Sequence, residues 1–191
     1  MALRFTFTRI LPTLLLFAAL IAGAISVDYL LHILGLAWIG RYCGFVGTAL
    51  ILISFIYSMR KRKWITSGSM KGLLKSHETL GWFGALVVLV HGGIHFYALI
   101  PWLALSAMLV VVASGLTGRF LLEDAQIRIK DQAEEMRKAG HSATDIDREL
   151  IGQSLLVDTM KQWRKVHMPL TMIFLALSLL HITATVLFWR W

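Results

Sequence analysis

The chain has 191 residues, of which 57% are hydrophobic and only 16% are charged, and its formal net charge is +8. Soluble domains carry about 25% charged residues, so this composition excludes an ordinary soluble domain and indicates a protein that lies in lipid. The positive charge does not indicate nucleic-acid binding, because the basic residues cluster between apolar segments, as in polytopic membrane proteins. The single cysteine excludes an intrachain disulfide and a cysteine-based zinc site.

Five apolar segments are each long enough to cross a bilayer, which takes about 20 residues of α-helix. They predict an all-α, multi-pass membrane protein whose helices form one bundle. The whole chain, residues 1–191, is expected to be a single membrane domain. Its spans are predicted at residues 10–33, 38–59, 77–99, 101–122 and 167–189.

The first segment also resembles a secretory signal peptide, because Arg4 and Arg9 precede an apolar run that contains the small residues at 22–24. The apolar run is long for a signal sequence. We therefore expect residues 10–33 to be retained as the first span.

Lysine and arginine set the expected orientation, because cytoplasmic loops of membrane proteins are enriched in both. The loop between spans two and three carries a basic cluster that consists of Arg60, Lys61, Arg62, Lys63, Lys71 and Lys75. This loop and the N-terminus are therefore predicted to be cytoplasmic, and the C-terminus to lie outside. The expected location is the inner membrane of the cell.

Residues 123–165 are polar and predict a helical hairpin between spans four and five, on the cytoplasmic side. The first helix is expected to reach Ala139 and to stop at Gly140. Ser142, with Asp145 three residues later, resembles a capping box that starts the second helix. The hairpin is either a solvated connector or a docking surface for a partner subunit, and both interpretations stay open.

Two pairs of histidines share one spacing. His77 and His91 are 14 residues apart, and so are His167 and His181. Fourteen residues of α-helix make just under four turns and rise about 21 Å. Each pair therefore places two imidazoles on nearly one face of its span, near opposite sides of a bilayer core about 30 Å thick. Spans three and five run in the same direction, which puts His77 and His167 near the cytoplasmic face and His91 and His181 nearer the outer face.

Polar side chains inside a membrane are costly and are usually functional. A lone histidine would be explained by a hydrogen bond between helices, but four with matched spacing and depth predict two bis-histidine haems stacked across the membrane. Gly81 and Gly84 lie on the same side as His77 and leave room for a flat cofactor. Arg119, near the cytoplasmic end of span four, is the candidate partner for haem propionates, because arginine binds carboxylates with a fork of donors.

A second polar group lies near the outer ends of spans one and three and consists of His32, His95, Asp28 and Tyr29. His95 follows His77 by five helical turns and has a suitable phase for ligation, but His91 is preferred because its depth matches that of His181. Three interpretations of the group stay open: a quinone or proton site, a third haem held by His32 and His95, or polar residues at headgroup level.

The run HETLGWFGALVVLVH at residues 77–91, with WRKVHMPLTMIFLALSLLH at residues 163–181, resembles the membrane-bound b-type dihaem cytochromes. These include the cytochrome b of quinol-oxidising complexes and the cytochrome b561 and ferric-reductase-like group. In these families two helices each carry two histidines about four turns apart and hold two haems b. The resemblance covers spans three to five and extends only to the ligands His77, His91, His167 and His181. A Pro-Glu-Trp-Tyr motif is absent, which puts a bc-type quinol site in doubt.

The resemblance implies transmembrane electron transfer by a subunit of a respiratory oxidoreductase complex. Electrons would pass between a quinone, as substrate, and a redox partner subunit, with two haems b as cofactors. A stand-alone cytochrome b561-like reductase and a non-catalytic membrane anchor of a respiratory complex are the alternatives. A metal-ion or proton carrier that uses His91, His95 and His181 is a third class.

Overall fold

The computed structural model describes residues 11–93, 98–118 and 123–188, and every element in these ranges is a helix. The helices are α2 (Leu11–Ile33), α3 (Trp38–Ser54), α4 (Ile56–Lys61), α5 (Met70–Gly92), α6 (Leu99–Thr117), α7 (Glu123–Lys138) and α8 (Ala143–Phe188). Five stretches are long and apolar enough to cross a membrane: α2, α3 with α4, α5, α6 and the C-terminal half of α8. The predicted all-α class with five long apolar helices is thus confirmed.

The apolar side chains of these stretches face mainly outward. Only 11–17% of the residues in each stretch are buried. Large side chains on four different helices are mostly exposed, including Tyr29 at 66%, Phe45 at 69%, Leu99 at 73% and Leu179 at 66%. Soluble monomers rarely expose contiguous apolar surface on this scale. The arrangement therefore fits a multi-pass membrane protein whose outer surface contacts lipid.

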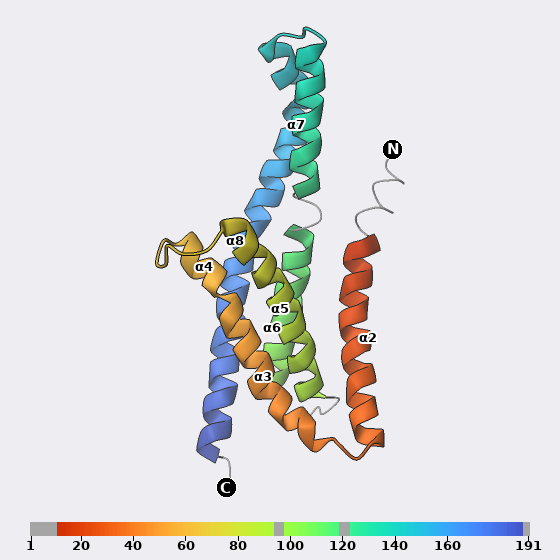
Figure 1. Cartoon of the computed structure of the whole chain (residues 1–191), viewed down its shortest axis with the longest axis vertical. Coiled ribbons are helices and arrows are strands. Elements are labelled where there is room, and N and C mark those ends of the chain that lie inside the picture. The colour runs from red at the N-terminus through yellow and green to blue at the C-terminus, as the bar shows by residue number, and fades with distance from the viewer. Residues whose placement is uncertain (1–10, 94–97, 119–122, 189–191) are drawn as a thin grey trace.

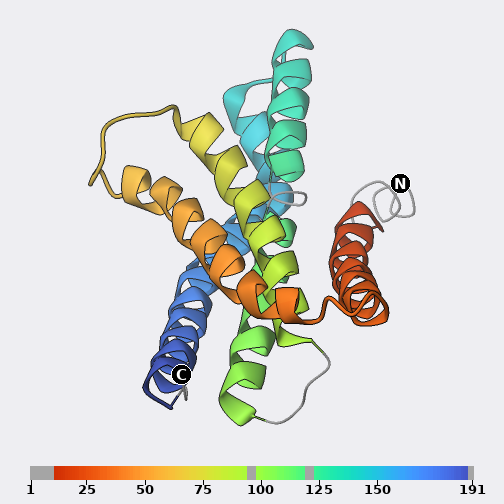
Figure 2. The same ribbon diagram turned by 60° about the horizontal axis from the view of Figure 1, so that its bottom comes forward.

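The bundle consists of two antiparallel helix pairs, α3 with α5 and α6 with α8, and α2 packs against α5 (Figure 1). Figure 2 shows α2 at the edge of the bundle. The two helices that carry the histidine pairs, α5 and α8, belong to different pairs, and their described backbones hardly approach each other. A small core joins the pairs through one side chain from each of four helices: Leu20, Ala85, Met108 and Phe174.

The α3–α5 pair is packed through glycine. A Cβ on Gly47 would lie 2.6 Å from Cγ2 of Val88 and 3.1 Å from the carbonyl oxygen of Gly84. A Cβ on Gly84 would lie 2.8 Å from the side chain of Ile51 and 3.3 Å from the carbonyl oxygen of Gly47. Small residues let membrane helices approach this closely. The two glycines therefore set the distance and the register between α3 and α5.

The third helix begins and ends earlier than predicted. Ser69 caps α5, since its Oγ accepts a hydrogen bond from the backbone N–H of Gly72 at 3.1 Å. Gly93, at φ +53°, ends the helix in a conformation that favours glycine. The predicted span at 77–99 is therefore wrong at both ends, because hydropathy detects the apolar stretch and not the capped polar turn before it. His91 consequently lies in the last turn of α5.

The second and fourth spans also differ from the prediction. The span predicted at 38–59 is divided at Phe55 into α3 and α4. The fourth helix begins at Leu99, two residues before Pro101, a first-turn position that a proline tolerates. Its described part ends at Thr117, whereas 101–122 was predicted.

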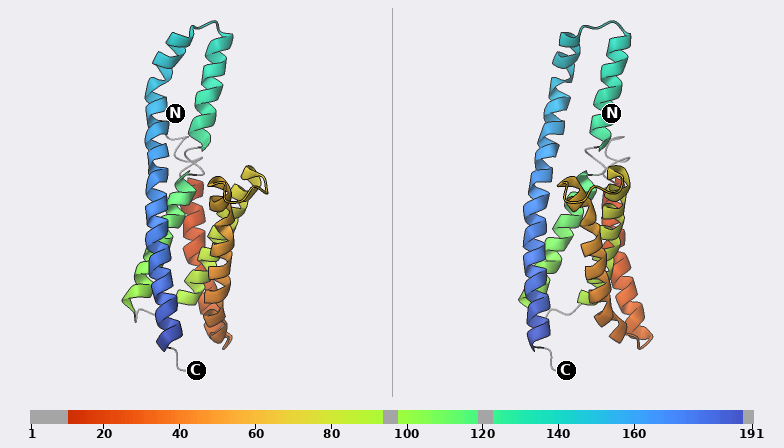
Figure 3. Two further views of the ribbon diagram at one scale, coloured as in Figure 1. Left: turned by 90° about the vertical axis from the view of Figure 1, so that its left-hand side faces the viewer. Right: turned by 60° about the vertical axis from the view of Figure 1, so that its left-hand side comes forward.

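The predicted hairpin is present and extends beyond one end of the bundle (Figure 3). Gly140, at φ +83°, follows α7 as expected. Ser142 Oγ accepts from the backbone N–H of Asp145 at 3.3 Å and donates to its Oδ2 at 2.6 Å, so the predicted cap is confirmed. The expected break before span five is wrong: α8 continues for 46 residues through Pro169. Residues 153–168 contain no glycine or proline that would stop it.

We expect Gly47→Val to destabilise the bundle by about 1–3 kcal/mol, because the new side chain overpacks the α3–α5 contact against backbone atoms. Unfolding in detergent, followed by circular dichroism, measures the change. Gly23→Ala is the matched control, since its Cβ meets only a Leu86 methyl at 3.5 Å, an ordinary contact. Equal stability of the two variants would contradict the close approach of α3 and α5.

Candidate functional site

His91 on α5 and His181 on α8 face each other across the two helix pairs. Their ring centres lie 6.5 Å apart and their planes are inclined by 51°. Metal–imidazole bonds are about 2.0–2.1 Å long, so two imidazoles on opposite sides of one metal ion have ring centres roughly 6 Å apart. The observed separation therefore leaves space for one metal ion between the two rings.

The His91 ring is held from behind by α3. Its Nδ1 lies 3.0 Å from the carbonyl oxygen of Gly40. A carbonyl only accepts hydrogen bonds, so Nδ1 carries the proton and the neutral ring keeps its lone pair on Nε2. Gly44 lies against the same ring, because a Cβ at that position would stand 2.8–2.9 Å from three ring atoms.

His77, one helix span away on α5, is held in the same way. Its Nδ1 lies 3.0 Å from the carbonyl oxygen of Ser54, at the end of α3. The ring also packs on Tyr57 of α4, with centres 5.4 Å apart and planes inclined by 31°. Nδ1 must again be the donor, which leaves Nε2 as the ring nitrogen that can bind a metal.

The histidines of α8 contact α6 and their own helix. Nδ1 of His167 lies 3.1 Å from Oγ of Ser114, a buried residue of α6, and either atom can be the donor. Thr171 Oγ1 donates to the carbonyl of His167 at 2.7 Å, and Thr185 Oγ1 donates to that of His181 at 2.8 Å. Each α8 histidine is thus followed by a threonine one turn later that bonds back to its carbonyl.

The two tiers of histidines differ in geometry. The outer pair, His91 and His181, is brought together, and one of its rings is exposed while the other is half-buried. The predicted cytoplasmic-side pair, His77 and His167, makes no ring contact in the part of the chain that the structure describes. Each of these two rings lies against a different helix pair. The site residues therefore fit one shared metal ion at the outer tier, and the inner tier has no comparable approach.

The second polar group is only partly described. Nδ1 of His32 lies 2.8 Å from the carbonyl oxygen of Asp28 and 3.6 Å from its Oδ1, and that carboxylate side chain is 13% exposed. Tyr29 is largely exposed. His95 and Arg119 lie outside the described residues, so the third-haem and propionate predictions remain predictions.

Several residues that hold the imidazoles were missed by the sequence interpretation. They are Gly40, Gly44, Ser54 and Tyr57 on α3 and α4, and Ser114 on α6. A signal was present, because small residues recur every seven positions at Gly40, Gly47 and Ser54. This spacing matches the fourteen-residue spacing of the histidines and their midpoint, Gly84.

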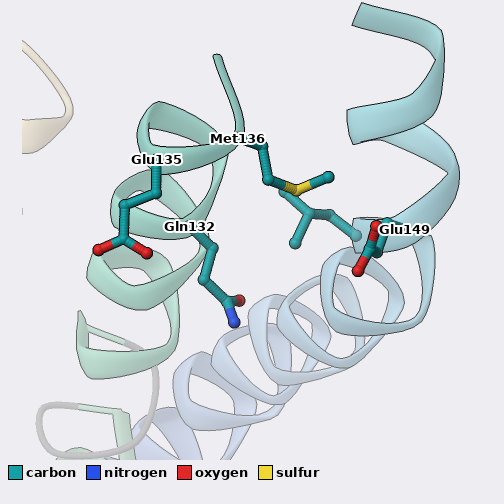
Figure 4. A pocket seen from close by; sticks show the side chains of 5 residues that line it. Gln132, Glu135, Met136 and Glu149 are labelled. Carbon is teal, nitrogen blue, oxygen red and sulfur yellow. The ribbon is translucent and has the colours of Figure 1, made fainter. Parts of the chain in front are cut away.

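Other parts of the described chain offer less chemistry. No group of three or more His, Cys, Asp or Glu side chains gathers as a metal site within the described ranges. A hollow on the hairpin is lined by Gln132, Glu135, Met136, Glu149 and Leu150, two of them carboxylates (Figure 4). Comparison of the chain with family models, curated proteins and solved structures finds no match.

The facing of α5 and α8 predicts a specific cross-link. With Cys43 replaced by Ser, the pair His91→Cys and His181→Cys should be joined by a short bifunctional thiol reagent and yield a product that migrates faster under denaturing conditions. The control pair, His77→Cys with His181→Cys, should not react, because fourteen residues of helix separate the tiers by about 21 Å. Equal cross-linking of both pairs would contradict the arrangement.

Proposed function

We propose that this protein is a membrane cytochrome b that carries electrons across the membrane on two haems. His91 and His181 ligate the outer haem, and His77 and His167 ligate the cytoplasmic-side haem. The observation that carries the proposal is the 6.5 Å approach of His91 and His181 from two helices whose backbones hardly meet. Packed helices have axes about 8–10 Å apart, and a ligand–metal–ligand bridge needs a wider spacing.

The number of protein ligands favours haem over a bare metal ion. A structural or catalytic zinc ion takes at least three protein ligands, and the described chain gathers no such group. In haem the macrocycle occupies the equatorial positions and the protein supplies axial ligands. Two imidazoles on opposite sides are therefore a complete protein contribution to a haem iron.

The chain's own residues prepare the ligands and insulate them. Donation from Nδ1 to the carbonyls of Gly40 and Ser54 fixes the tautomer of each α5 imidazole and raises its basicity as a ligand. Phe174 lies seven residues from each α8 histidine and packs in the core with Ala85, so apolar side chains fill the level between the tiers. Haem, when bound, supplies one-electron exchange, for which the protein needs to provide no proton donor.

Quinone is the proposed membrane-soluble partner. Gly23 faces Leu86, so Asp28, five residues further along α2, lies near the depth of His91, five residues further along α5. Oxidation of a quinol releases two electrons and two protons. The outer haem would accept the electrons one at a time, and the Asp28–His32 pair would accept a proton at the outer end of α2.

The proposed orientation places the basic cluster on the cytoplasmic side of the inner membrane. The hairpin of α7 and α8 lies at the same end of the bundle as the α4–α5 loop (Figure 1). It is the largest described part outside the candidate spans. We propose it as the docking surface for a redox partner subunit.

A membrane anchor that binds a single haem is the second candidate, and one observation favours it. His77 packs on Tyr57 and makes no ring contact with His167 among the described residues. In that case only the outer tier would hold a haem, and the inner histidines would serve as contacts between helices. The number of haems decides between the two candidates.

We expect the purified protein to contain about two non-covalent haems b per polypeptide, because two tiers of histidines are available. A pyridine haemochrome assay with a protein determination measures the ratio. A ratio near one supports the single-haem anchor, and a ratio of zero refutes the cytochrome. A ratio of three would promote His32 and His95 to ligands.

Single substitutions should separate the tiers. His91→Ala and His181→Ala should each remove one low-spin haem signal and leave the other, and His77→Ala and His167→Ala should remove the complementary signal. Low-temperature optical and electron paramagnetic resonance spectra distinguish the two. The control is His141→Ala on the hairpin, which should retain both signals. Loss of a haem from His95→Ala while His91→Ala keeps both would reassign the α5 ligand.

Reduction tests the quinone partner. A quinol analogue should reduce the haems of the isolated protein, whereas NADH should not. Asp28→Asn should slow quinol-driven reduction and leave reduction by dithionite unchanged, since only the former releases a proton near α2. If ascorbate reduces the protein and no quinol does, the cytochrome b561-like alternative is correct.

A further inference from the structure

We infer that α3 is a positioning helix, which fixes both imidazoles of α5 through two of its backbone carbonyls and one glycine. The carbonyls belong to Gly40 and Ser54, and the glycine is Gly44. The inference deepens the proposed function, because it names the residues that prepare Nε2 of each α5 ligand. It concerns the protein itself and can be tested before any cofactor is bound.

The register of α3 against α5 makes the positioning possible. The acceptors Gly40 and Ser54 are 14 residues apart, as are the donors His91 and His77. The helices are antiparallel, so the two hydrogen bonds form at opposite ends of one helix pair. Gly47 and Gly84, each midway between these ends, are in close backbone contact. Any slip of α3 by one residue would misplace both acceptors together, and the glycine contact prevents it.

The two hydrogen bonds leave only one tautomer for each ring. A carbonyl oxygen cannot donate, so the proton of each neutral imidazole resides on Nδ1. Among the residues that the structure describes, neither Nε2 of His77 nor Nε2 of His91 has a hydrogen-bond partner. α3 thus turns the basic nitrogen of both rings away from itself. Oγ of Ser114 does not impose this on His167, because a hydroxyl both donates and accepts.

Gly44 adds a steric part to the positioning. Three atoms of the His91 ring would lie 2.8–2.9 Å from a Cβ at this position. Carbon atoms do not approach so closely, so any side chain here displaces the ring from the Gly40 carbonyl. The helix backbone therefore forms a wall behind the imidazole, and it fixes where the outer ligand points.

Nitrogen NMR of the haem-free protein tests the inference directly. The protein, labelled with 15N-histidine and held in lipid nanodiscs near neutral pH, should show protonated Nδ1 and unprotonated Nε2 for His77 and His91. Their resonances are assigned by their loss in His77→Ala and His91→Ala. Protonated Nε2 on either ring would overturn the inference. This result does not depend on haem, so it is distinct from a failure of the proposed function.

Gly44→Ala and Gly23→Ala form the matched pair of variants. Gly44→Ala should abolish the protonated-Nδ1 signature of His91 and keep that of His77, and Gly23→Ala should keep both. In the haem-loaded protein, Gly44→Ala should shift the midpoint potential and the resonance spectrum of the outer haem only. If Gly44→Ala leaves His91 unchanged, the steric part is wrong. If the variant does not fold, the spectrum of the unaltered protein still decides the inference.

Discussion

The structure depends on how imidazole nitrogens are satisfied inside a membrane. A histidine has two ring nitrogens, and lipid provides a partner for neither. On α5 one nitrogen of each ring is satisfied by a carbonyl of α3, and on α8 one nitrogen of His167 is satisfied by Ser114 of α6. The helix pairs α3–α5 and α6–α8 are thus also pairs of support and ligand. What remains, the second nitrogen of each α5 ring, is available for the proposed haem iron.

A common spacing organises the supporting contacts. Histidines, carbonyl acceptors and back-bonding threonines all recur at intervals of 14 residues, and the close glycine contact and Phe174 occupy the midpoints. Seven residues are almost two turns of α-helix, so each such set stays on one helix face. The bundle therefore has two equivalent levels for polar groups with an apolar level between them. This layering separates the two proposed haems while keeping them in one protein.

Much of the fold was predictable from hydropathy, and the sites of helix capping at Gly140 and Ser142 were predictable from local chemistry. Helix ends at Ser69 and Gly93 were not, because hydropathy does not distinguish a helix that continues into water from one that stops. The continuity of α8 through Pro169 was missed for the same reason. Histidine spacing predicted that His91 and His181 would meet, but it could not show that His77 lies on Tyr57. That contact depends on the break between α3 and α4 at Phe55, which leaves no signal in composition.

The most direct test of two stacked haems is the distance between them. Pulsed electron paramagnetic resonance of the fully oxidised protein measures the dipolar coupling between ferric centres. Fourteen residues of helix predict an iron–iron distance of about 21 Å, with both centres low-spin, as bis-histidine ligation requires. A single low-spin centre without dipolar partner, or a coupling that corresponds to a clearly different distance, would contradict the account.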